Sequence, residues 1–177
     1  EPDPARAGTS RLDAYSVAAR LSFLLWNSTP DAALLDAAQR GALHQSSTLR
    51  AEAERLLASP RVERGTRAFF ADMLNLDRLE TMQKDSAIYP SFSLAAAKDA
   101  GEQTLRTLTD HLIAKNGDYR DVFTLRDTYV TAALGLVYDI PVQDPTGWSK
   151  FTFAPEDRRA GIQNQLSFVA LHSHPGK

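Results

Sequence analysis

The chain has 177 residues, of which 43% are hydrophobic and 24% charged, a balance typical of a folded globular protein. Its 20 basic and 22 acidic residues give a net charge of -2, which argues against nucleic acid as a partner because general nucleic-acid binders carry a basic excess. The absence of cysteine excludes disulfides, iron–sulfur clusters and covalent attachment of haem c within this chain.

The first nine residues contain two prolines and a glycine among charged side chains, which is typical of an inter-domain linker. The other end closes on Pro-Gly-Lys. We therefore expect residues 1–9 to be a linker from a preceding domain. Residues 10–177 are expected to form a single helical domain that is truncated at its C-terminus.

Helical patterns follow one another from residue 10 onward. Ser10 precedes an apolar stripe that continues to Trp26, and Thr29, Pro30 and Asp31 together form a compact start signal for a second helix. Further helices are predicted over residues 48–59, 61–76, 91–116 and 131–138. No apolar run approaches the ~18 residues that a membrane span requires, so no membrane insertion is expected.

The stretch 140–154 contains two prolines, a glycine and alternating aromatic residues, which predicts a small hairpin or an extended arm. The last helix is predicted to start at Pro155 and to run over residues 158–172. Together these elements predict an all-α fold, a bundle of six to eight helices with short connections and a short extended or hairpin segment near residues 140–154.

His172 and His174 are candidate cofactor ligands because a neutral imidazole binds haem iron and transition metals well. Residues two apart on a helix point about 200° apart, so this pair can share one ion only from an extended chain. Structural or solvent-exposed histidines are the simpler interpretation. The alternative is a ligand role completed by residues outside this chain.

A second candidate lies on the predicted helix 91–116, where Asp99 and Glu102 share a face upstream of His111. The arrangement is similar to half of a bundle carboxylate site, but the Glu-x-x-His pair that such sites need is absent. The simpler interpretation is a solvated face with the basic residues Lys98 and Arg106 as ion-pair partners. No metal site is predicted.

The remaining candidates are binding residues. Trp148, Phe151 and Phe153 form either a platform for a sugar or a protein partner, or part of the core. Arg158 and Arg159 are predicted at a helix start, where they oppose the helix dipole. They are expected to pair with acids of neighbouring helices or, alternatively, to clamp a haem propionate or a substrate carboxylate. Nucleophile-elbow, dinucleotide and phosphate-loop motifs are absent, so no catalytic residue is predicted.

Three stretches carry a resemblance to a known family: LDAYSVAARLSFLLWNSTPDAALLDAA, ASPRVERGTRAFFADMLNLDRLE, and YVTAALGLVYDIP with the later DRRAGIQNQLSFVALHSHPGK. From about Leu12 to Lys177 the chain resembles an uncharacterised all-helical domain of large secreted bacterial proteins with c-type cytochrome-like segments. The resemblance implies an extracytoplasmic location, periplasmic or at the cell surface. It also implies neighbouring domains of the same polypeptide as partners and haem c in the parent protein, bound by a downstream segment.

Our hypothesis is a non-catalytic structural or interaction module that positions neighbouring domains of a larger extracytoplasmic, cytochrome-associated protein. The first alternative is a domain of a redox enzyme that encloses a haem or metal cofactor held mainly by other segments, with His172 or His174 as a ligand. The second alternative is a carbohydrate- or polymer-binding module that uses Trp148, Phe151 and Phe153.

Overall fold

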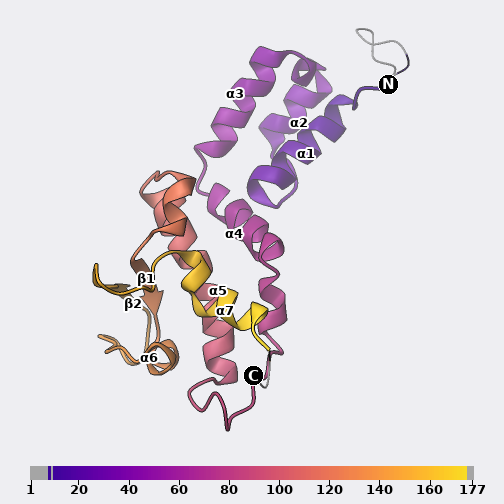
Figure 1. Ribbon diagram of the computed structural model, residues 1–177. Helices are drawn as coiled ribbons and strands as arrows, with labels where there is room; N and C mark the ends of the chain where they lie inside the picture. The colour runs from indigo at the N-terminus through magenta and orange to yellow at the C-terminus, as the bar shows by residue number, and fades with distance from the viewer. Residues whose placement is uncertain (1–7, 9, 175–177) are drawn as a thin grey trace. The chain divides into compact units, whose positions relative to one another are not determined.

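The computed structural model describes residue 8 and residues 10–174, and Figure 1 traces the chain. The predicted linker at residues 1–9 lies outside the described residues apart from Gly8. Contacts within the chain divide it after Ala68 into a first and a second compact unit. The division falls within helix α4, Val62–Met73. That residues 10–177 form one domain stays a prediction.

The first unit contains α1 (Ala14–Trp26), α2 (Ala32–Gln39), the 3-10 turn η1 (Ala42–His44) and α3 (Ser46–Leu57). Its first two helices start on aspartates: the carboxylate of Asp13 accepts from the Ser16 amide at 2.9 Å, and that of Asp31 accepts from the Leu34 amide at 3.0 Å. The predicted starts at Ser10 and Thr29 are therefore early. A carboxylate next to the first turn takes these amides and also complements the helix dipole.

Trp26 is the central aromatic side chain of the first unit and is only 2% exposed. Its Nε1 donates to the carbonyl oxygen of Leu56 at 2.9 Å, which ties the end of α1 to the end of α3. The Arg61 guanidinium lies 4.9 Å from the centre of the Trp26 ring. Gly65 then passes so close to the Leu25 carbonyl that a Cβ would collide with it, so glycine is required for this crossing.

The second unit is organised around α5, Leu94–Thr109. This helix packs against β1 (Asp127–Val130), α6 (Ala132–Tyr138), α7 (Leu166–His172) and the 3-10 turn η2 (Leu76–Leu79). Figure 1 shows α7 lying along α5. Ser93 accepts from the Ala96 amide at 3.1 Å and so starts the helix. The predicted helix 91–116 starts three residues early, and its last turn, η3 (Asp110–Ala114), is π-helical rather than α-helical.

A single antiparallel sheet joins β1 to β2 (Ser149–Thr152), with Asp127 opposite Thr152 and Val130 opposite Ser149. The extended segment predicted near residues 140–154 is confirmed for β2. Its partner strand lies upstream of the predicted range, however, and α6 stands between the two strands in sequence. Two 3-10 turns complete this unit, η4 (Tyr119–Phe123) and η5 (Ile162–Asn164).

The predicted helix 158–172 is wrong over its first half. Gly161 has a φ of +79°, which no α-helical residue adopts, and a Cβ there would strike the backbone of Phe123. The chain therefore turns at residues 155–161, and α7 begins only at Leu166.

The predicted class is confirmed, since the described residues form seven α-helices and one two-stranded sheet. None of the helices in this part of the chain has both the length and the apolar character of a membrane crossing.

Candidate functional site

An apolar groove with a volume of about 340 Å³ lies between the segment 84–92, α6 and α7 of the second unit. The segment is shaped by Asp85, whose carboxylate accepts from the Ala87 amide at 2.9 Å and whose carbonyl accepts from the Tyr89 amide at 2.8 Å. Most of the groove-lining side chains are apolar; the lining comprises Lys84, Tyr89, Pro90, Ser91, Phe92, Val137, Leu166, Val169, Ala170 and Ser173. Pockets of this size and character are typical of binding sites.

Lys84 is the charged residue of this lining. Its Nζ donates to the Ala170 carbonyl, the Ser173 carbonyl and the Ser173 hydroxyl, each at 2.9 Å. The ammonium group therefore caps the C-terminal end of α7, where helix carbonyls otherwise lack partners. Burial lowers the pKa of Lys84, and no carboxylate of the described residues pairs with it.

His172 is the last residue of α7 and is exposed, and His174 follows in the chain beyond the helix. The imidazole of His172 stacks on Phe168 with ring centres 4.3 Å apart, and its Nδ1 lies 2.8 Å from the Phe168 carbonyl oxygen. Because a carbonyl oxygen only accepts, Nδ1 must carry the proton. In a neutral imidazole Nε2 then carries the lone pair, and this tautomer is one that ligating histidines use.

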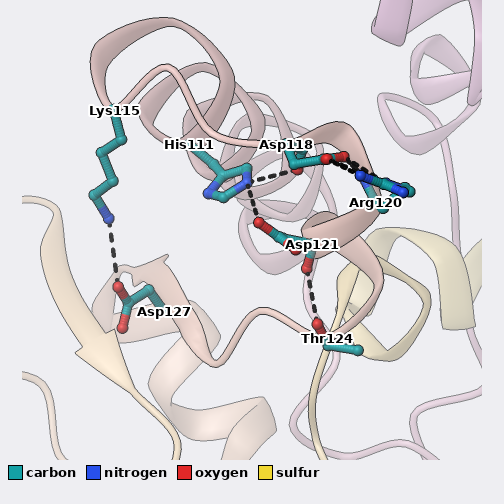
Figure 2. Close-up of polar contacts among 7 residues, drawn as sticks. All are labelled: His111, Lys115, Asp118, Arg120, Asp121, Thr124 and Asp127. Atoms are coloured by element: carbon teal, nitrogen blue, oxygen red, sulfur yellow. Dashed lines mark hydrogen bonds and ion pairs between the residues drawn. The ribbon is translucent and has the colours of Figure 1, made fainter.

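His111, by contrast, is 9% exposed, and its side chain stabilises the turn that follows α5. Its Nε2 donates to the Asp118 carbonyl at 2.9 Å and lies 3.8 Å from the Asp121 carboxylate, as Figure 2 shows. Gly117 packs so tightly on the imidazole that a Cβ would collide with it. Of the two carboxylates upstream, Glu102 pairs with Arg106 at 2.8 Å, as expected for a solvated face, whereas Asp99 accepts from the Thr131 hydroxyl at 2.6 Å.

A small cleft of about 70 Å³ lies beside the sheet, with two aspartates and two lysines in its walls. Asp110 accepts from Lys115 at 2.9 Å and from Lys150 at 3.2 Å, and Lys115 also reaches Asp127 at 3.4 Å, a contact drawn in Figure 2. Burial acts to raise the pKa of Asp110, but the two lysines outweigh it and hold that pKa below its ordinary value. The cleft is small, and the lysines neutralise its carboxylates.

Buried polar side chains form a network inside the second unit. Tyr138 donates to Gln103 Oε1 at 2.8 Å and accepts from the Leu166 amide at 2.7 Å. Gln103 Nε2 in turn donates to Thr128 at 3.1 Å. Burial is the main reason that the pKa of Tyr138 rises to about 12. Further hydroxyl and amide groups extend the network from α5 to α7: Thr104, Thr107, Gln165 and Ser167.

The three aromatic residues for which a platform and a core role were both considered are divided between core and surface. Phe153 is 6% exposed and packs edge-on against Tyr138, with ring centres 5.9 Å apart. Phe151 contacts Phe153 edge-on at 5.1 Å, and the guanidinium of Arg106 lies 4.8 Å from the centre of the half-buried Trp148 ring. Phe153 is therefore not presented on a surface together with the other two rings.

The predicted arginine pair is also split. Arg158 is exposed, whereas Arg159 pairs with Asp157 at 2.7 Å and donates to the Tyr138 carbonyl. The expected ion pair with a neighbouring helix is wrong for Arg159, because its partner lies two residues away in the same turn. Hydrogen bonds from Arg159 lower the pKa of Asp157 to about 2.

Sequence reasoning missed the groove. The dipeptide Tyr89-Pro90 is typical of an extended or turn segment, but nothing in the local sequence links Lys84 to a helix end more than 80 residues later. Among residues 8 and 10–174, no cluster of three or more His, Cys, Asp or Glu side chains is placed to hold a metal ion.

Comparison with known families gives a match over most of the chain. The model of the family described as "PSD4: Protein of unknown function (DUF1592)" matches residues 12–140. No curated protein and no solved structure matches the chain.

Proposed function

The chain belongs to this family of proteins of unknown function, and from that premise we propose that it is a non-catalytic binding and scaffolding module. Its parent would be a larger extracytoplasmic, cytochrome-associated protein, whose neighbouring domains the module positions. The apolar groove of the second unit carries the proposal, because its walls are mostly apolar and its size is typical of a binding site.

The distribution of polar partners supports binding rather than catalysis. The buried hydroxyl and amide groups around Tyr138 bond to one another, and Asp110 is held by two lysines. His111 is bonded to a backbone carbonyl in a tight turn. Groups engaged in this way specify the fold and are not poised to exchange protons with a substrate.

Fluorescence of phenylnaphthylamine, an uncharged aromatic probe, tests the groove. Val169 lines the groove and is 49% exposed, so Val169→Glu should fold normally and place a carboxylate among apolar walls. We expect the affinity for the probe to fall about tenfold or more. Leu136→Glu is the matched control, because Leu136 is 72% exposed on α6 and does not line the groove. Equal binding by both variants would remove the groove from the proposal.

A second candidate function is a contribution to a haem or metal site completed by another segment. The observation that favours it is the bond from His172 Nδ1 to the Phe168 carbonyl, which leaves Nε2 available for a metal. Bound haem would supply electron transfer, and His172 would supply one imidazole ligand to its iron. In the parent polypeptide proposed above, His172→Ala should then shift the haem absorption spectrum, whereas Phe168→Leu should not. An unchanged spectrum in His172→Ala would exclude this role.

A further inference from the structure

The chemistry of the groove identifies its ligand more closely, an inference that rests on the proposed function. The groove combines apolar walls with one cation, Lys84, which has three neutral acceptors and no carboxylate partner in the described part of the chain. Lys84 is half-buried, so its ammonium group is only partly hydrated and attracts an anion beside it more strongly than it would in open water. We therefore expect the ligand to carry a single negative charge at the end that lies beside Lys84.

The hydrogen bonds of Lys84 allow such an anion to enter. Two of its acceptors are carbonyls fixed by the end of α7, but the third is the Ser173 hydroxyl, which can rotate. That hydroxyl also donates to the Ala170 carbonyl at 3.3 Å. An incoming carboxylate oxygen can accept the third Lys84 proton while Ser173 keeps its bond to Ala170, so no donor is left without a partner.

The walls favour a hydrocarbon body over a peptide. An extended peptide brings an N–H and a carbonyl with almost every residue, and each needs a partner once water is displaced. The apolar walls cannot supply such partners, because their side chains offer only hydrocarbon surface: Phe92, Val137, Leu166 and Val169. A molecule with one polar end and an aliphatic tail meets both requirements.

We propose that the groove binds an aliphatic carboxylate, with its head on Lys84 and its tail along Val137, Leu166 and Val169. The head determines orientation and the tail supplies most of the affinity, since each buried methylene strengthens binding by about fourfold. Because a hydrogen bond to a charged group is stronger than one to a neutral group, a carboxylate should bind about tenfold or more tightly than the alcohol of the same length.

Displacement of phenylnaphthylamine by hexanoate, octanoate, decanoate and octanol, all below their micelle concentrations, tests this. We expect affinity to rise about fourfold per methylene and octanoate to exceed octanol by about tenfold. Lys84→Met should abolish the difference between octanoate and octanol, and Lys84→Arg should retain it. Amide spectra of each variant, recorded by NMR, identify any loss of folding, and the comparison of octanoate with octanol in the unaltered chain stands without the variants.

The outcomes separate this inference from the proposed function. If octanol and octanoate displace the probe equally, the groove binds apolar molecules but the role of Lys84 is wrong. If neither displaces a probe whose binding Val169→Glu weakens, the occupant is not an aliphatic molecule and the inference fails, although the groove remains a site. If the probe itself does not bind the groove, the proposed function fails as well.

Discussion

Tyr138→Phe tests how the second unit is held together. The substitution removes one oxygen atom from a buried site and keeps the aromatic ring, which contacts Phe153. That oxygen serves two groups: it donates to Gln103 Oε1 at 2.8 Å and accepts from the Leu166 amide at 2.7 Å. Without it, an amide oxygen on α5 and the first amide of α7 both lose their partner in the interior.

The expected cost follows from the number of groups left unsatisfied. Each buried polar group without a partner costs about 1–3 kcal/mol, so two groups set a range of about 2–6 kcal/mol. Some relaxation of the flexible Gln103 side chain lowers the upper end. We therefore expect the free energy of unfolding of the second unit to fall by about 3 kcal/mol, which is large beside a typical total of about 5–15 kcal/mol.

Native-state amide hydrogen exchange of α5 is the suitable assay, because its buried amides report the second unit alone. Tyr119→Phe is the matched control: Tyr119 lies in the same unit, is 44% exposed and makes ring contacts with Phe70 and Phe123. Its loss of an exposed hydroxyl should change stability by less than about 0.5 kcal/mol. If Tyr138→Phe costs no more than this control, the buried network does not stabilise the fold as we argue.

Three further predictions concern stability measured by urea unfolding. The pKa of Tyr138 is raised to about 12, so the contribution of its protonated hydroxyl to the free energy of unfolding is complete below pH 10, the ordinary tyrosine pKa. This contribution is lost as the pH rises towards 12. Between pH 10 and 12, Tyr138→Phe should therefore lose less stability than the unaltered chain. Gly65→Ala should destabilise the first unit by about 1–3 kcal/mol through collision with Leu25, whereas Gly101→Ala, which has room for a Cβ, should stabilise the second unit by up to about 1 kcal/mol. Asp31→Ala should cost about 1 kcal/mol because α2 loses its N-cap, and the reverse sign would contradict that role.

Helical periodicity predicted most of the fold from the sequence, because the apolar stripe of a helix must be buried whichever element it packs against. The short helix at 131–138 was confirmed almost to the residue, as α6 spans Ala132–Tyr138. Helix starts were less accurate. Ser10 and Thr29 have the right chemistry for a cap, but Asp13 and Asp31 have it too and lie closer to the first turn.

Other features depend on contacts that sequence patterns do not encode. The strand at 127–130 contains β-branched and aromatic residues, yet its pairing with 149–152 spans an intervening helix. The break at Gly161 follows from its close approach to Phe123, a residue far away in sequence. The groove is of the same kind, since Lys84 meets Ser173 only after both segments have packed.

Some buried or half-buried polar groups stabilise the fold, and others are able to bind a ligand. Their hydrogen-bond partners distinguish the two kinds. Tyr138 and Gln103 are neutral and hydrogen-bond to other neutral protein groups, so neither needs a ligand as a partner. Lys84 also has all three N–H bonds satisfied, but by neutral acceptors, and burial lowers its pKa. Its hydrogen bonds are thus complete, and the carbonyl end of α7 offsets part of its charge, but no carboxylate of the described residues pairs with it. An anion in the groove supplies a balancing negative charge, which stabilises the protonated form of Lys84. By thermodynamic reciprocity, the protonated form is the one that binds the anion. The same protonated form caps α7.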